Sequence, residues 1–170
     1  MASDQKSICP GCGLQMPLSD AVVNRGYYNT SPECFSVYTE VLGDEFGNVL
    51  LFGQVHQLTV DTYAVQHAGG VHPDKSIDVH LVGLYLGLER GLTSTRVPKL
   101  LKRLADTVSY WPHFPPPTET GSVTVLEVAL ADSVEAHMKL VREWAGQLWD
   151  AWSPYHAEVT ALVAEHVPLD

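Results

Sequence analysis

Three cysteines are the residues of this sequence best suited to metal or redox chemistry. Cys9 and Cys12 form a Cys-x-x-Cys motif with Pro and Gly between them and Gly after them. This composition is typical of a tight turn that points both sulfurs at one ion. The alternatives are a redox pair or unligated thiols, but the βαβ pattern that usually surrounds a thioredoxin-like motif does not occur.

Two thiolates supply half of the four ligands of a usual structural zinc site. Cys34 is the expected third ligand, because it falls in the first turn of a predicted helix, where free N–H groups stabilise a thiolate. His56 is the expected fourth ligand, because it follows Cys34 by the same spacing that separates Cys34 from Cys12. An aspartate, a different histidine or water remain alternatives. The expected cofactor is therefore a structural Zn²⁺ ion.

The chain also has eight histidines, a high number for its length. His80, His137 and His156 are expected to be half-buried on separate helices, where side chains on facing helices could form a second divalent metal site. Such a site with an open position for water would be hydrolytic or act as a Lewis acid. The alternative is that each is a hydrogen-bonded histidine at the edge of the core.

Asp61, His67 and His80 are the candidate catalytic residues, with Asp61 or His67 as a further ligand or a general base. Asp61 lies between apolar residues and should be paired, ligating or at the surface. His67 shares a helix face with His56 but lies about 16 Å along the helix, so the two cannot bind one ion. Gly83 and Gly87 share one column of the predicted helix with His80. Two glycines within a helix reduce its stability, so we expect another backbone or a ligand to approach closely beside His80.

The elements that must position these residues are mainly helices. Ser31 suits an N-cap and Pro32 a first helical position. Residues 110–121 contain four prolines and cannot be helical, and residues 122–131 suit a short strand or a helix start. The predicted helices cover residues 30–46, 56–70, 75–91 (with Ser76 as N-cap), 93–108 and 134–152, and a shorter one runs to His166 after a break at Ser153-Pro154. The expected fold is a mainly α helical bundle with an N-terminal zinc-knuckle loop.

Length and composition favour one globular domain over residues 1–170, with the knuckle and first helix in 8–55 and the bundle in 56–170. The net charge of −10 and the 10 basic residues disfavour a nucleic-acid or anionic-membrane partner. Met1–Ser7 lacks a signal-peptide pattern, so the expected location is cytoplasmic. Trp144 and Trp149 flank an apolar stripe, so at least one is expected to line a groove or contact another subunit, and a homo-oligomer is possible.

The chain resembles a family of uncharacterised bacterial proteins, a domain of unknown function with an N-terminal knuckle. The resemblance rests on Cys34 and on the motifs CPGCG, HQLTVDTYAVQH, VHLVGLYLGLERG and WAGQLWDAWSPYH. It implies one domain and carries no activity. Histidines on separate helices are also similar, at the level of fold, to DinB-type metal-dependent bundles.

Two functions follow as hypotheses. The first is a zinc-binding helical bundle that acts as a metal-dependent, hydrolase-like enzyme through a second histidine-rich site. The alternative is a non-enzymatic, zinc-stabilised module that binds a small-molecule ligand or a protein partner whose identity is unknown. The sequence contains no nucleophile motif, phosphate loop or dinucleotide fingerprint that would define a reaction.

Overall fold

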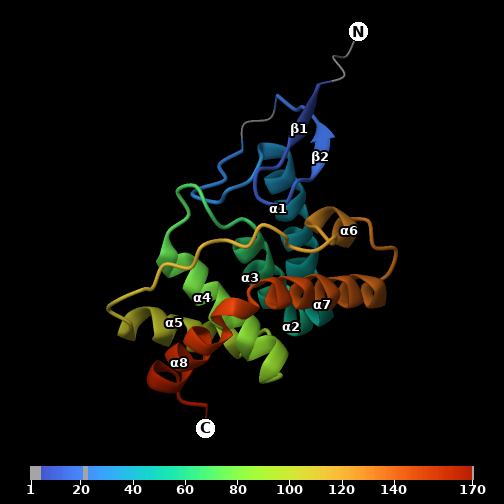
Figure 1. Ribbon diagram of the computed structural model, residues 1–170. Helices are drawn as coiled ribbons and strands as arrows, with labels where there is room; N and C mark the ends of the chain where they lie inside the picture. Colours follow the sequence, from blue (N-terminus) through green and yellow to red (C-terminus); the bar gives the residue numbers. More distant parts are fainter. Residues whose placement is uncertain (1–4, 21–22, 170) are drawn as a thin grey trace.

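The structure, a computed structural model, describes residues 5–20 and 23–169, and it is mainly helical, as expected (Figure 1). A two-stranded antiparallel hairpin, β1 (Lys6–Ile8) and β2 (Gln15–Pro17), precedes the helices. The α-helices are α1 (Pro32–Gly47), α2 (Val49–Gln54), α3 (His56–Gln66), α4 (Asp74–Leu84), α5 (Val97–Thr107), α6 (Val125–Ala129), α7 (Val134–Ala151) and α8 (His156–His166). No described helix is long and apolar enough to cross a membrane.

Helix α1 begins where the sequence predicts. Ser31 is its N-cap and accepts a hydrogen bond from the Cys34 amide at 3.2 Å, and Pro32 is the first helical residue. After Gly47, Asn48 caps the short helix α2 by accepting hydrogen bonds from two backbone amides. Helix α2 turns the chain back, so that α3 returns along α1.

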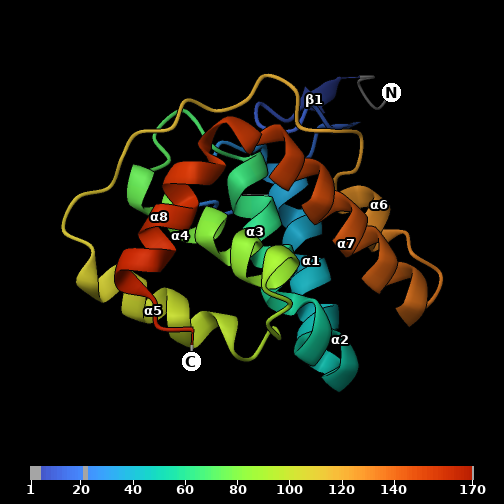
Figure 2. The same cartoon turned by 60° about the horizontal axis from the view of Figure 1, so that its bottom comes forward.

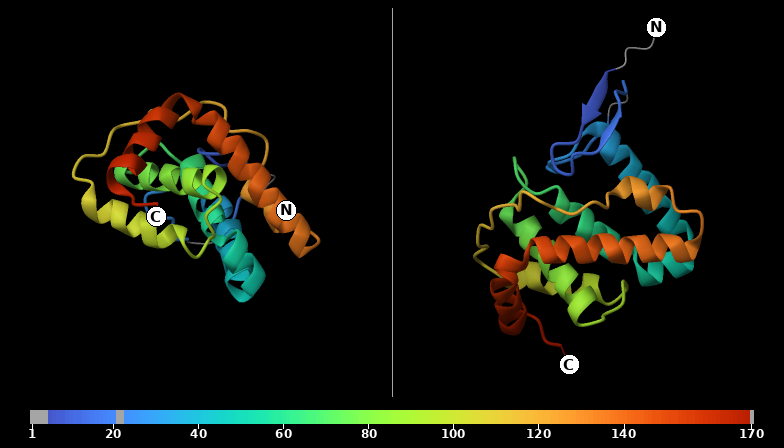
Figure 3. Two further views of the ribbon diagram at one scale, coloured as in Figure 1. Left: turned by 90° about the horizontal axis from the view of Figure 1, so that it is seen from below. Right: turned by 45° about the vertical axis from the view of Figure 1, so that its right-hand side comes forward.

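Helices α1 and α3 are antiparallel neighbours. At one end, Glu45 near the end of α1 lies 3.0 Å from the first residue of α3, His56. At the other end, Cys34 in the first turn of α1 lies 3.5 Å from His67, which follows α3. This arrangement places the C-terminal end of α3 beside the N-terminal hairpin (Figure 3, right).

Helix α3 lies in the middle of the bundle, between α4 and α7 (Figure 2). Its Tyr63 is fully buried and contacts the buried Trp144 of α7 edge to face. The indole N–H of Trp144 donates to Gln66 of α3 at 3.0 Å. Trp149, whose indole donates to Glu89, is buried as well, and one hydrophobic cluster extends from Cys9 to Val167. The hairpin is therefore joined to the same core as the helices.

Helix α4 differs from the sequence prediction at both of its ends. Helix α4 begins at Asp74 after Pro73, so Ser76 is not its N-cap; the Ser76 hydroxyl instead pairs with His72 at 2.9 Å. The end of this helix is a π-helical turn, η1 (Tyr85–Glu89), in which the amide of Arg90 donates to the Tyr85 carbonyl.

The C-terminal half follows the predicted pattern. Within residues 122–131, Val125–Ala129 form the short helix α6 rather than a strand, and Thr124 and Glu127 make a capping box at its start. Helix α7 buries its apolar stripe, including Val141, Ala145 and Leu148. The chain then breaks at a 3₁₀ turn, η2 (Ser153–Tyr155), before α8.

Candidate metal centre

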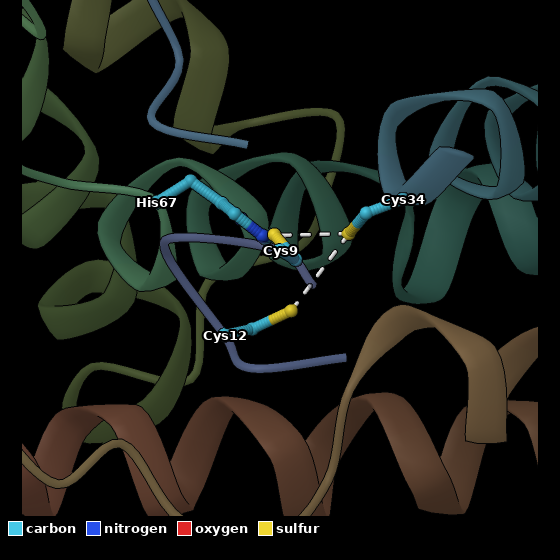
Figure 4. Close-up of side chains that lie close together, drawn as sticks. All are labelled: Cys9, Cys12, Cys34 and His67. Carbon is cyan, nitrogen blue, oxygen red and sulfur yellow. Dashed lines mark hydrogen bonds between the residues drawn. The ribbon is translucent and has the colours of Figure 1, made fainter. Parts of the chain in front are cut away.

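Three segments that are distant in the sequence bring Cys9, Cys12, Cys34 and His67 together (Figure 4). The two N-terminal cysteines come from the turn of the β1–β2 hairpin, Cys34 from the start of α1 and His67 from the end of α3. One ligand atom from each side chain lies within 4.8 Å of all the others. Cys12 is half-buried and the other three side chains are buried. The four side chains could hold one metal ion.

The turn itself is stabilised by its backbone. The Cys9 amide donates to the Leu14 carbonyl, and the Gly13 amide donates to the Cys9 carbonyl, both at 2.9 Å. Gly13 has a φ of 75°, which glycine adopts without a steric penalty. Gly11 serves a different purpose: a Cβ atom there would lie 2.5 Å from Cδ2 of His67 and also against the Asn29 carbonyl. The missing side chain lets the turn lie directly against the histidine.

Cys34 lies at the positive end of α1. Its sulfur is 3.8 Å from the Cys12 sulfur and accepts a hydrogen bond from the Tyr63 hydroxyl at 3.6 Å. The Tyr63 hydroxyl also pairs with Thr30 at 2.7 Å, and the Thr30 hydroxyl lies 3.5 Å from the Cys9 sulfur. Hydroxyl groups therefore surround two of the sulfurs, and one of these sulfurs also lies at the N-terminus of α1.

His67 is held in the orientation that a metal ligand needs. Its Nδ1 lies 2.7 Å from the Tyr63 carbonyl, which can only accept, so Nδ1 carries the proton. This leaves Nε2 as the free ligand atom, and Nε2 faces the Cys34 sulfur at 3.5 Å. The Tyr63 ring stacks on the imidazole with ring centroids 3.9 Å apart. A second hydrogen bond of this kind is what usually orients a metal-binding histidine.

Two distances agree with tetrahedral coordination. Sulfurs about 2.3 Å from a tetrahedral zinc ion lie about 3.8 Å apart, and such a sulfur lies about 3.5 Å from a zinc-bound imidazole nitrogen. Cys12 and Cys34 have their sulfurs 3.8 Å apart, and the Cys34 sulfur lies 3.5 Å from Nε2 of His67.

The crowding of the thiols shifts their protonation. Hydrogen bonds from Cys12 and Cys34 hold the pKa of Cys9 far below its ordinary value. Hydrogen bonds with Cys34 and Cys9, followed by burial, raise the pKa of Cys12 instead. Burial lowers the pKa of His67, but Cys34 and Cys9 outweigh burial and raise it to about 9. Cys9, Cys12 and His67 therefore influence the protonation of their neighbours in this cluster.

The structure places His67, and not the expected His56, beside the thiols. His56 lies at the opposite end of α3, where its Nδ1 pairs with the buried Glu45 at 3.0 Å. Glu45 also accepts hydrogen bonds from His137 at 2.7 Å and Thr59 at 2.6 Å. Burial alone would raise the pKa of Glu45, but these three hydrogen bonds together lower it. The correction follows from the antiparallel path of α3, which carries its first residue away from the hairpin.

The structure does not bring His80, His137 and His156 together. His80 pairs with Asp61 at 2.7 Å, His137 belongs to the Glu45 cluster, and His156 donates to the Trp149 carbonyl while stacking on its indole. Among residues 5–20 and 23–169, the Cys9 cluster is the one group of three or more potential ligands close enough to share an ion. The placement of these three histidines gives no support to a second metal site.

Asp61 is fully buried, and His80 and Gln57 both donate to its Oδ1, at 2.7 and 2.8 Å. Burial raises the pKa of Asp61, and the hydrogen bonds offset part of this effect. The candidate catalytic residues are thus divided: Asp61 and His80 are in contact, whereas His67 lies at the metal centre.

The sequence pattern led to His67 being predicted as a catalytic residue rather than as a ligand of the Cys9 cluster. The signal that identifies it is topological: two helices joined by a short connection are antiparallel, so the end of the second lies beside the start of the first.

Comparison with curated proteins and comparison with solved structures both give no match. Residues 7–153, which include all four potential ligands, match a family of unknown function, DUF5946. The chain belongs to this family.

Proposed function

We propose that the protein binds one Zn²⁺ ion through Cys9, Cys12, Cys34 and His67. The observation that carries the proposal is that the four ligand atoms lie within 4.8 Å of one another, with the Cys12–Cys34 and Cys34–His67 distances equal to those of a tetrahedral site. Soft thiolates with one imidazole favour zinc over magnesium or calcium, which prefer oxygen ligands.

The ion has a structural role. Four protein ligands close the coordination sphere, whereas a catalytic zinc keeps one position open for water or substrate. The ligands come from the hairpin, from α1 and from α3, so the ion joins three segments. The hairpin has two strands of three residues each, too few to be stable without such a link.

This role supports the second hypothesis, a non-enzymatic, zinc-stabilised module, over a hydrolase. A general base needs a free nitrogen, and in the proposed site Nε2 of His67 is bound to the ion while Nδ1 donates to Tyr63. With all four of these side chains bound, a tetrahedral ion would have no position left for a substrate.

Metal content tests the proposal. Purified wild-type protein should contain one zinc per chain, and Cys12→Ser and His67→Ala should lose most of it. His56→Ala is the matched control, since it removes a histidine from the same helix, and it should retain the metal. A zinc-free wild-type protein with a Cys9–Cys12 disulfide would instead support the redox interpretation, and loss of zinc in His56→Ala alone would refute the assignment of His67.

A further inference from the structure

A cavity of about 330 Å³ lies on the side of α3 that faces α4, at the opposite end of the helix from the metal centre. Its apolar walls are Leu58, Leu88, Leu92 and Val97. Its polar lining residues are Gln54, Gln57, Asp61, Thr93, Ser94 and Arg142. Apolar walls with a few converging polar groups are typical of a small-molecule site.

Asp61 in the lining of this cavity has an unsatisfied oxygen. Its Oδ1 accepts both available hydrogen bonds, from His80 and Gln57, while Oδ2 has no partner among the described residues. The side chain is 1% exposed. A buried carboxylate oxygen without a donor is costly, and native structures contain few of them. A positive charge bound in the cavity beside Asp61 would offset part of this cost.

The backbone around Asp61 is adapted to leave room for the carboxylate. A Cβ atom on Gly83 of α4 would collide with both carboxylate oxygens. Gly87 is on the π-helical turn η1, and a Cβ there would lie 3.3 Å from Leu58. The helix therefore ends in π-helical rather than α-helical geometry at this cavity. The two mid-helix glycines and the π turn are both unfavourable for the helix, and both lie at this cavity.

Arg142 contributes a positive charge to the same cavity. Its guanidinium is exposed and donates a long hydrogen bond, 3.5 Å, to Gln54. It forms no ion pair with a described carboxylate. The cavity thus offers a buried acceptor at Asp61 and an exposed cation at Arg142, with apolar walls between them.

We propose that this cavity binds a small zwitterion. Its ammonium group lies at the Asp61 end of the cavity and is attracted by the buried carboxylate, its anionic group pairs with Arg142, and its carbon chain contacts Leu58, Leu88 and Leu92. This site is separate from the zinc centre, and its occupancy does not depend on the identity of the metal.

Calorimetric titration of the metal-loaded full chain tests the proposal, with glycine, 4-aminobutyrate and 6-aminohexanoate as probes of increasing length. One of the three should bind, and butylamine and butyrate, which each lack one charged group, should bind at least tenfold more weakly than 4-aminobutyrate or not at all. Failure of all three probes to bind would overturn the proposal.

Variants locate the site. Asp61→Asn keeps the size of the side chain and Arg142→Gln changes an exposed residue, and each should weaken binding of the best probe at least tenfold. Arg103→Gln, another exposed arginine, is the matched control and should bind normally. Unchanged affinity in Arg142→Gln would refute the proposal even if Asp61→Asn does not fold. Zinc content should be normal in every variant, which separates this result from any failure at the metal centre.

Discussion

Gly11 provides the sharpest test of how the metal centre is built. In Gly11→Ala the new methyl group would lie 2.5 Å from Cδ2 of His67, whereas ordinary contacts begin at 3.4 Å. The turn and the imidazole must therefore separate by about 1 Å, since steep repulsion prevents closer approach. Metal–ligand distances tolerate only about 0.2 Å. Changes that only reorient a metal ligand lower metal affinity about 10–100-fold. Because Gly11→Ala displaces the ligand, we expect zinc affinity to fall about 100-fold, which is about 3 kcal/mol of binding free energy.

The assay is a competition titration against a chromogenic zinc chelator. Gly146→Ala is the control, because a Cβ atom there meets open space, and it should bind zinc like wild type. Circular dichroism should show that Gly11→Ala keeps its helices, since Gly11 lies outside all of them. Zinc affinity within threefold of wild type would refute the claim that the turn must lie against His67.

Two further predictions concern buried carboxylates. Glu45→Gln should lower the free energy of unfolding in urea by about 2–3 kcal/mol, because hydrogen bonds to a charged group are worth about that much. The exposed pair Lys102–Asp106 is the control, and Lys102→Ala should change stability by less than about 1 kcal/mol; equal effects would contradict the buried network. Asp78 is buried without a hydrogen-bond partner among the described residues, and burial raises its pKa from 3.8 to about 8. The unfolded chain releases this proton near pH 4 and the folded protein near pH 8, so wild-type stability should fall as the pH rises between these values. The free energy of unfolding of Asp78→Asn should therefore increase relative to that of wild type as the pH rises from 4 to 8. A difference between the two proteins that does not change with pH would contradict this prediction.

The knuckle was predictable because its signal is local. Cys9 and Cys12 fall in one turn, and the Ser31-Pro32 pair is by itself a helix-start signal that puts Cys34 in the first turn of α1. The resemblance to a family of unknown function and the mainly α fold are also confirmed.

The fourth ligand could not be predicted from spacing along the chain, because it depends on the direction in which α3 runs relative to α1. His56 is the first residue of α3 and His67 directly follows its last, but which end meets the hairpin depends on α2. Helix α2 was not predicted, because it has only 6 residues and includes Gly53. Once α2 reverses the chain, His56 meets Glu45 and His67 meets the thiols.

The hydrogen-bond partners of His80 and His137 could not be predicted either, because they lie far away in the sequence. His80 and Asp61 are on different helices, and only the contact between α3 and α4 makes them partners. The mid-helix glycines did point to close approach at this place, and Gly83 accommodates the Asp61 carboxylate.

The order of the ligands along the chain has a consequence for synthesis. All four lie at or before residue 67, and the helices that cover α3, namely α4 and α7, are encoded after it. At about 5–20 residues per second, the remaining 103 of the 170 residues take about 5–20 s to translate. The hairpin, α1 and α3 can therefore meet around an ion while the rest of the bundle is still being made. Metal supply during translation, rather than after release, would then set the yield of folded protein.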